Sequence, residues 1–277
     1  MAILTALVPK RVDRRAEGHH GDMAGTLDRG AVVAALRDAG CVAAEEEADE
    51  LLAVASGDDV GALVSRRVHG EPLAWITGRS RFCGLTVHVD RGVYVPRWQT
   101  QVLAETAAVL LPVSGTAIDL CTGSGAIAMV LHAARQLATV LATEIDPAAV
   151  ACARRNGVDT YQGDLFGPLP QSLRGTIDVV TGVVPYVPSD AMHLLPRDVA
   201  EFEPRAALDG GGDGLTVLRR AICDAGAWVR EGGWIALESG VDQVDEASVL
   251  LMAGGFGGVV ELRDDDGDRR GVLAQRV

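Results

Sequence analysis

The chain has 277 residues, of which 48% are hydrophobic and 23% are charged, and its formal net charge is −13 at pH 7. This length predicts either one large domain or a main domain with a small companion, and we expect the second. No apolar run approaches the roughly 18–20 residues of a membrane span, so no membrane partner is expected. The acidic balance and the lack of a basic stripe exclude a nucleic-acid surface, because phosphate binding needs a basic footprint.

The cysteines and histidines also exclude some classes of site. The five cysteines are dispersed and show no C-x-x-C spacing. This pattern predicts reduced core thiols and a cytoplasmic location. No histidine has companion ligands at metal spacing, so no metal site is expected.

The N-terminal part of the chain has helical periodicity after an expected disordered extension of residues 1–25. From Leu27 to about Gly70 the apolar spacing predicts three short helices. Gly40 and the stretch Ser56-Gly57-Asp58 would separate them, and Gly70-Glu71-Pro72 would end the bundle.

A β-hairpin is expected next. Arg81 to Asp90 and Val93 to Pro96 alternate apolar and polar residues around Arg91-Gly92, which predicts the hairpin turn at that pair. This hairpin, residues 81–96, would link a helical domain of residues 26–80 to a second domain of residues 97–277.

From Thr116 onwards strands and helices alternate, which predicts an α/β fold with a mainly parallel, doubly wound sheet. The expected strands are Thr116–Cys121, Thr139–Glu144, Asp159–Gln162, Thr176–Val184 and Trp234–Glu238, with Gly257–Arg263 and Val272–Arg276 as a closing pair. The expected helices are Ala126–Arg135, Pro147–Asn156, Gly214–Arg230 and Val241–Met252. Ligands of such sheets bind at the carboxyl ends of the strands, where we expect Asp119, Glu144, Asp164 and Val183 to converge.

The turn after the first of these strands predicts a nucleoside cofactor site. Because Gly123 and Gly125 lack a Cβ, the backbone can approach a ligand closely, and a side chain at Gly125 is expected to intrude on it. The turn fits the pattern G-x-G-x-x-A, and Glu144 lies 19 residues after Gly125, as in either a NAD or an S-adenosylmethionine site. Asp119 favours S-adenosylmethionine, since a carboxylate attracts its ammonium group and repels a pyrophosphate. The candidate cofactor-binding residues of this turn are Asp119, Thr122, Gly123, Ser124 and Gly125.

Several motifs, in their order along the chain, carry a family resemblance. They are Gly70-Glu71-Pro72-Leu73, Val95-Pro96-Arg97-Trp98-Gln99-Thr100, Asp119 to Ala128, Gly163-Asp164-Leu165-Phe166, Val183 to Pro188 and Phe202-Glu203-Pro204. From about Leu27 to Val277 the chain resembles the HemK/PrmC protein-glutamine N5-methyltransferases. The resemblance implies a helical N-terminal domain before a class I methyltransferase domain with a Rossmann-like sheet. It also implies S-adenosylmethionine as cofactor and, as substrate, the glutamine of a Gly-Gly-Gln loop in peptide-chain release factors.

The resemblance also implies roles for single residues. Gly123 and Gly125 would line the methionine part of the cofactor, and Glu144 would accept hydrogen bonds from the ribose hydroxyls. Asp164 and Leu165 would bind the adenine. Two alternatives remain open from the residues themselves: Asp146 in place of Glu144 as the ribose ligand, and Asp164 as a turn residue.

The acceptor motif departs from the family. Asn-Pro-Pro-Tyr is replaced by Val183-Val184-Pro185-Tyr186, and Gln101 stands where the family loop has an acid. In the family the Asn side chain would accept a hydrogen bond from the substrate amide, which Val183 cannot do. An unpaired buried amide donor costs about 1–3 kcal/mol, so glutamine is expected to be a poor acceptor. The loop residues expected near the acceptor are Arg97, Trp98 and Thr100.

Three functions therefore remain as hypotheses. The first is a protein N-methyltransferase that acts on a glutamine-like side chain, with the carbonyl of Val184 and water replacing the Asn. The second is a small-molecule methyltransferase of specialised metabolism whose acceptor does not need the Asn. The third is a non-catalytic cofactor-binding protein, which the complete cofactor motif disfavours.

Overall fold

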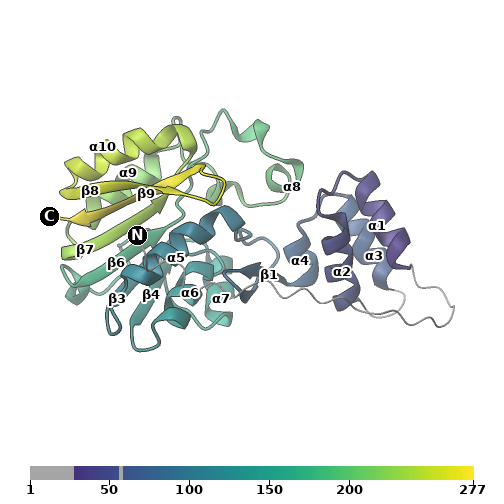
Figure 1. Cartoon of the computed structure of the whole chain (residues 1–277), viewed down its shortest axis with the longest axis horizontal. Coiled ribbons are helices and arrows are strands. Elements are labelled where there is room, and N and C mark those ends of the chain that lie inside the picture. The colour runs from purple at the N-terminus through teal and green to yellow at the C-terminus, as the bar shows by residue number, and fades with distance from the viewer. Residues whose placement is uncertain (1–27, 56–58) are drawn as a thin grey trace.

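The computed structural model of the protein describes residues 28–55 and 59–277. The expected extension of residues 1–25 and the break at Ser56-Gly57-Asp58 lie outside these residues. Figure 1 shows a helical group at one end of the molecule and a larger sheet domain at the other, with α4 and β1 between them. Among the described residues no helix is both long enough and apolar enough to cross a bilayer.

The helical group contains the three expected helices and a fourth that was not expected. Their bounds are α1 Arg29–Asp38, α2 Ala44–Val54, α3 Asp59–Val68 and α4 Leu73–Thr77. Asp28 caps α1, because its side chain accepts a hydrogen bond from the Ala31 amide at 2.9 Å. Buried aliphatic residues from α1, α2 and α3 form a separate small core. Helix α4 has only five residues, which is too short to show helical periodicity in the sequence.

The expected hairpin is present, but the prediction of its turn was wrong. Strands β1 (Arg79–Phe82) and β2 (Leu85–His88) pair antiparallel, and Cys83 and Gly84 form the turn between them. Both turn residues have positive φ, 45° and 76°. A two-residue turn with positive φ at both positions matches the twist of the paired strands. Such turns usually contain Asn, Asp or Gly at the first position, so a Cys there does not indicate a turn in the sequence. The linker therefore starts at Arg79. Arg91-Gly92 forms a separate turn after it, in which the Val93 amide donates to the Asp90 carbonyl at 3.1 Å, and no strand follows directly to make it a hairpin turn.

The sheet has seven strands in the order β5-β4-β3-β6-β7-β9-β8, which confirms the doubly wound prediction. The strands are β3 Thr116–Leu120, β4 Thr139–Glu144, β5 Asp159–Gln162, β6 Ile177–Gly182, β7 Val229–Glu238, β8 Phe256–Arg263 and β9 Arg269–Arg276. Strands β3 to β7 are parallel, and β9 pairs antiparallel with both β7 and β8. The chain leaves β3 towards β4 and returns to its other side as β6, so the strand order reverses between β3 and β6.

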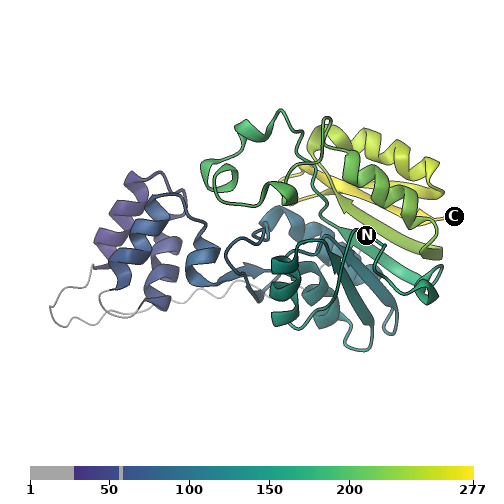
Figure 2. The ribbon, with the colours of Figure 1, turned by 180° about the vertical axis from the view of Figure 1, so that it is seen from behind.

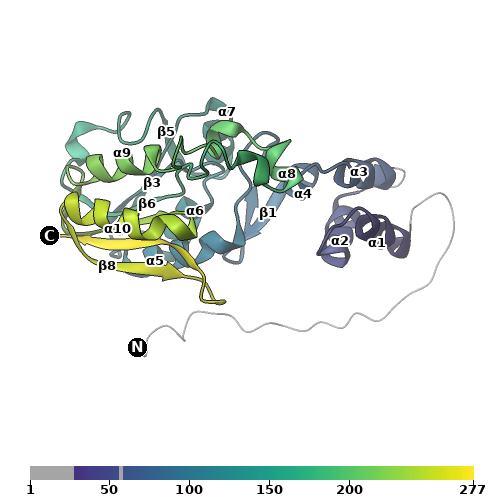
Figure 3. The same cartoon turned by 90° about the horizontal axis from the view of Figure 1, so that it is seen from above.

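Helices cover both faces of this sheet (Figures 1 and 3). They are α5 Gln101–Leu110, α6 Ala126–Ala134, α7 Pro147–Arg155, α9 Thr216–Ala225 and α10 Val244–Ala253. Successive strand residues point to opposite faces, so Ala117 packs with the core of α5, α6 and α7 while Ile118 packs with that of α9 and α10. Helix α5 was not predicted. The helix expected over Gly214–Arg230 is shorter, because the chain turns after Ala225 and the buried Trp228 leads into β7.

A long segment between β6 and α9 leaves the sheet and reaches the helical group. It contains the short helix α8 (Arg197–Ala200), which both Figure 1 and Figure 2 place between the sheet domain and α3. The Phe202 ring of this segment packs edge-to-face on Trp75 of α4, with 6.4 Å between the ring centroids. The segment after β6 therefore connects the two parts of the molecule.

Candidate active site

One row of residues crosses the carboxyl edge of the parallel strands. The strand registers pair Leu120 with Thr143, Leu120 with Gly182, and Gly182 with Leu237. Thr143, Leu120, Gly182 and Leu237 thus lie level with one another on four adjacent strands. The next residue along each strand therefore lies at the same edge, in the order Glu144, Cys121, Val183, Glu238. The sequence predicted Glu144 and Val183 at this edge, but it did not single out Cys121 or Glu238.

The two glycines of the turn after β3 have different environments. Gly123 has a φ of 57°, and a Cβ added there would meet no atom within 4 Å. Gly125 has a φ of 85°, but its added Cβ would lie 2.8 Å from Val158 Cγ2 and 3.3 Å from Ala153 Cβ. The expectation that a side chain at Gly125 would meet the ligand is therefore corrected: Gly123 faces open space, and Gly125 is required for packing against α7.

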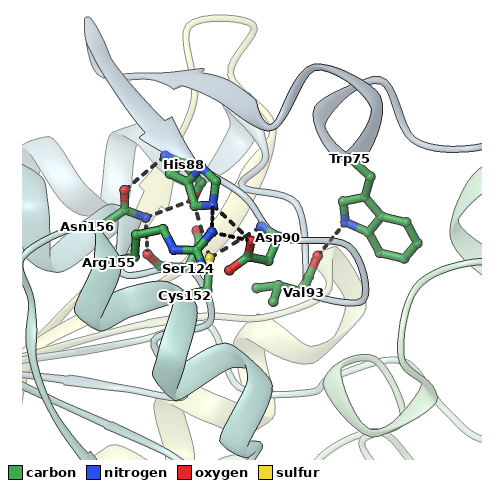
Figure 4. A network of polar contacts seen from close by, with 8 residues as sticks. All are labelled: Trp75, His88, Asp90, Val93, Ser124, Cys152, Arg155 and Asn156. Atoms are coloured by element: carbon green, nitrogen blue, oxygen red, sulfur yellow. Dashed lines mark hydrogen bonds and ion pairs between the residues drawn. The ribbon is translucent and has the colours of Figure 1, made fainter. Parts of the chain in front are cut away.

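Hydrogen bonds from the Asn156 side chain also hold the glycine turn after β3 (Figure 4). The Asn156 side-chain amide donates at 2.8 Å to the carbonyl oxygens of both Ser124 and His88, and its oxygen accepts from the His88 amide at 2.9 Å. Asn156 follows α7, Ser124 belongs to the glycine turn and His88 ends β2. This side chain therefore couples the cofactor turn to the linking hairpin.

Asp119 lies below the turn and is 1% exposed. Its carboxylate accepts hydrogen bonds from the hydroxyls of Thr122 at 2.5 Å and Thr181 at 2.7 Å. Burial, together with the nearby Glu144 charge, raises its pKa to about 6, although the two hydroxyls act in the opposite direction. Asp119 and Thr122 line a cavity of about 40 Å³ beside Gly123, so the carboxylate borders the space that the turn leaves open.

Glu144 is buried at the end of β4, and backbone amides hold its carboxylate. Its Oε2 accepts from Gly123 N at 2.9 Å, and its Oε1 accepts from Ile145 N at 2.8 Å and Asp146 N at 3.0 Å. A carboxylate has about four lone-pair sites, so one remains for a ligand hydroxyl. Burial raises its pKa, while the amides favour the ionised form.

The alternative to Glu144, Asp146, lies at the start of α7. The Asp146 side chain caps α7 by accepting from the Ala148 amide at 2.8 Å. Asp146 still borders the same cavity of about 70 Å³ as Glu144, Gly123 and Val183. Both acids border this cavity, so the choice of Glu144 over Asp146 as the ribose ligand stays a prediction.

Asp164 and Leu165 lie further out, beyond β5. The Asp164 carboxylate forms an ion pair with Arg220 of α9, and both side chains are about half exposed. Leu165 is buried and has a positive φ of 46°. Neither residue lines the two cavities beside the glycine turn, so their expected contact with an adenine stays a prediction.

A larger cleft of about 550 Å³ lies on the other side of Val183. Of the expected acceptor residues, Arg97, Trp98, Val183, Val184 and Tyr186 line this cleft. Pro185 borders the cavity at Glu144, and Thr100 borders the cavity at Asp119. Val183 and Tyr94 line the cleft and both small cavities, so they form the boundary between them. Sequence reasoning missed Tyr94, which lay inside the wrongly placed second strand of the hairpin.

Arginines fix the loop that carries Arg97 and Trp98. The Arg97 guanidinium donates to the buried Glu203 at 2.5 Å and lies 5.0 Å from the centroid of the Tyr94 ring. Trp98 is 55% exposed, and the guanidinium of Arg270 stacks over its ring at 5.6 Å. The loop after the hairpin is thereby attached both to the Phe202-Glu203 segment and to β9. No group of three or more His, Cys, Asp or Glu that could hold a metal occurs in residues 28–55 and 59–277.

These features define the class of protein. The sheet order, the open glycine turn after β3 and the buried acid at the end of β4 are those of a class I methyltransferase fold. The hMettl16 catalytic domain, solved in complex with the MAT2A 3′UTR hairpin 6, has the same fold with a TM-score of 0.53. It shares 16% sequence identity over 77% of this chain and 81% of that chain.

Curated relatives identify the family, although no family model matches the chain. A release factor glutamine methyltransferase of Geobacter sulfurreducens is 36% identical over 221 residues, which are 78% of this chain and 76% of the relative. One from Mycolicibacterium smegmatis is 37% identical over 78% of each chain, and one from Moorella thermoacetica is 38% identical over 82% of this chain and 83% of the relative. The chain belongs to the family of release factor glutamine methyltransferases. It is an enzyme that uses S-adenosylmethionine, and the space at Gly123, the spare acceptor site on Glu144 and the position of Asp119 fit that cofactor.

Replacing Glu144 tests its contact with the cofactor. We expect Glu144→Ala to weaken S-adenosylhomocysteine binding by about 1–3 kcal/mol, because a charge-assisted hydrogen bond and the support of Gly123 N are both lost. Calorimetry with the matched variant Asp146→Ala, which loses only the cap of α7, should show nearly unchanged affinity. Weaker binding in Asp146→Ala together with normal binding in Glu144→Ala would assign the ribose to Asp146.

The pH dependence of binding tests Asp119. Since its pKa is about 6, the carboxylate is ionised above that pH and neutral below it. If the ionised form holds the cofactor ammonium, affinity is full above about pH 6 and falls by up to about tenfold for each pH unit below it. Titration calorimetry of S-adenosylhomocysteine between about pH 5 and pH 7.5 measures this change. Asp119→Asn should bind more weakly and lose most of the slope, and an equal slope in both proteins would contradict the contact.

Proposed function

We propose that the enzyme transfers the methyl group of S-adenosylmethionine to a nitrogen acceptor held in the cleft of about 550 Å³. The observation that carries the proposal is the position of Val183 and Tyr94, which border both the cleft and the cavities at the glycine turn. A donor at Gly123 and an acceptor in the cleft would then meet at these two side chains. The reaction is an in-line displacement, to which the protein contributes orientation and exclusion of water.

The residues divide into three groups under this proposal. Glu144, Asp119 and the turn from Thr122 to Gly125 hold the ribose and methionine parts of the cofactor, while Asp164 and Leu165 contact the adenine. Arg97, Trp98 and Thr100 belong to the loop that closes over the acceptor. Val183, Val184, Pro185 and Tyr186 form the surface beside the methyl group.

A protein acceptor agrees with the names of the curated relatives, which are release factor glutamine methyltransferases. The helical group also lies where it can contribute to binding a large substrate. Its Trp75 packs on Phe202, and Phe202 belongs to the same segment as Leu195, Pro196 and Val199, which line the cleft. We infer that residues 26–80 recognise the substrate and that the enzyme acts on a protein in the cytoplasm.

The Val183 side chain offers no hydrogen-bond acceptor, so a glutamine amide would not be anchored by the side chain at position 183. A small-molecule acceptor is the second candidate, and the size of the cleft favours it. Sites for small ligands enclose about 300–1,000 Å³, and the cleft lies within that range at about 550 Å³.

Methyl transfer from labelled S-adenosylmethionine distinguishes these candidates. The purified enzyme would be incubated in parallel with a bacterial release factor and with a small-molecule cell extract. Label in protein supports the first candidate, and label in the extract alone supports the second. Absence of transfer to both, in an enzyme that binds S-adenosylhomocysteine, would contradict the proposed activity.

A further inference from the structure

Glu238 is a buried carboxylate beside Val183 that the cofactor site does not use. It ends β7, is 4% exposed, and lines the cleft of about 550 Å³ together with Val183. The register of β6 and β7 pairs Gly182 with Leu237, so the next residues along the two strands, Val183 and Glu238, are neighbours at the carboxyl edge. The closest strand-end carboxylate to the apolar position 183 is therefore Glu238.

Two hydrogen bonds orient the Glu238 carboxylate, and each of its oxygens can still accept one more hydrogen bond. Tyr186 OH donates to its Oε1 at 3.1 Å, and Thr100 Oγ1 donates to its Oε2 at 2.6 Å. A carboxylate has about four lone-pair sites, so each oxygen keeps one for a ligand. Its two hydroxyl donors come from the loop before α5 and from the segment after β6, both of which border the acceptor site.

Within residues 28–55 and 59–277, no basic side chain forms an ion pair with this carboxylate. Arg97 and Arg270 act on it from a distance, but they form ion pairs with Glu203 and Asp264. Burial raises the pKa of Glu238, and the hydroxyls of Thr100 and Tyr186 oppose that effect.

A second, independent observation points to a ligand at this place. The adjacent Ser239 is 4% exposed and lines the same cleft, and its Oγ has no hydrogen-bond partner within the described structure. Buried polar atoms normally have a partner, because an unpaired one costs about 1–3 kcal/mol. Glu238 and Ser239 are thus two side chains that line the cleft and have unused hydrogen-bonding capacity.

We propose that Glu238 binds the acceptor: its carboxylate accepts a hydrogen bond from an N–H group of the nitrogen to be methylated and takes up the proton that this nitrogen releases. The inference rests on the proposed N-methyl transfer and names the residue that recognises the acceptor. The substrate class is a nitrogen that carries at least one N–H, anchored from the end of β7 instead of from position 183. Ser239 supplies a second contact to the same group.

The proton balance of the step is simple. The acceptor nitrogen uses its lone pair for the new N–C bond, and the electron pair of the broken S–C bond stays on sulfur. Glu238 takes the N–H proton, so the product leaves as a neutral N-methyl compound. The protonated Glu238 carboxyl then releases this proton to water, which restores the carboxylate for the next turnover.

Binding of two matched probes tests the inference without knowledge of the natural acceptor. Both probes are adenosyl amino acids in which nitrogen replaces the sulfur and carries a short alkyl arm towards the acceptor site. The arm ends in a primary amine in one probe and in a methyl group in the other. Calorimetry should show that the wild-type protein binds the amine probe at least about tenfold more tightly, because a buried charge-assisted hydrogen bond forms only with that probe.

The variants decide which residue causes the preference. Glu238→Ala should reduce the ratio of the two affinities to near one, and Glu238→Gln, which keeps the size and one acceptor oxygen, should reduce it partly. Asp198→Asn changes another carboxylate of the same cleft and should leave the ratio unchanged. Affinity for S-adenosylhomocysteine should stay the same in all variants, which verifies that each one folds.

Two outcomes would overturn the inference: no amine preference in the wild-type protein, or a preference that survives in Glu238→Ala. Failure of the proposed function gives a different result, namely absence of methyl transfer to either acceptor class in the labelling assay. The probe measurement needs no turnover, so the two failures are distinguishable.

Discussion

Val183→Asn should raise methyl transfer to release-factor glutamine by about 10²–10³-fold, the value of one preorganised polar contact in an active site. Val183 borders the cleft and both cavities at the glycine turn, so an amide oxygen at this position would face the point where donor and acceptor meet. The natural acceptor should respond in the opposite direction, because an Asn without its partner adds an unsatisfied polar group. Rates on a Gly-Gly-Gln substrate and on the enzyme's own acceptor would be compared for both proteins.

The control for this change is Val183→Leu, which alters the size of the side chain without adding a hydrogen-bond acceptor. It should give no gain on glutamine. If the wild-type protein methylates glutamine as fast as a relative that carries Asn, Val183 is a tolerated variation and glutamine is the acceptor after all.

Substitutions at the two glycines of the turn should fail in different ways. Gly123→Asn should abolish S-adenosylhomocysteine binding with a small change in melting temperature, because its side chain enters open space and Asn tolerates a φ of 57°. Gly125→Val should lower the free energy of unfolding by about 2–6 kcal/mol, the sum of overpacking and backbone strain. The added atoms would overlap Val158 and Ala153, with the Cβ only 2.8 Å from Val158 Cγ2.

Thermal unfolding and calorimetry of both variants measure this contrast. A matched partial rescue exists for the second glycine. Gly125→Ala should lose less stability when combined with Val158→Ala than the two single changes predict together, since the double change removes the contact with Val158 Cγ2 while the backbone strain at a φ of 85° remains. Stable Gly125→Val protein that has lost only cofactor binding would show that Gly125, and not Gly123, faces the ligand.

The sheet domain was predictable because its strands and helices have strong local signals. Strands β4 and β5 begin and end at the predicted residues. The buried apolar pair Leu141-Ala142 indicates β4, and Thr160 and Tyr161 are residue types that favour strands. The hairpin turn was not predictable in the same way. Cys83 adopts a positive φ of 45° only because β1 and β2 pair around it, and that pairing is a tertiary property.

The candidate site shows the same division. Residues with a distinctive motif, such as Gly123 and Glu144, were found from the sequence. Tyr94 and Glu238 carry no motif of their own, and they join the site because the strand register and the loop after the hairpin bring them to Val183. Neighbours on adjacent strands are distant in sequence, so a local pattern does not reveal them.

The sequence by itself, through its resemblance to a known family, determined the class of enzyme and the cofactor, and it showed the departure at position 183, because the motifs that carry the resemblance are local features of the chain. Only the tertiary structure decided which glycine faces open space and which acid caps a helix. It also showed that a buried carboxylate stands beside Val183. Each of these depends on what packs against a residue from elsewhere in the fold, and burial and register exist only once the sheet has formed.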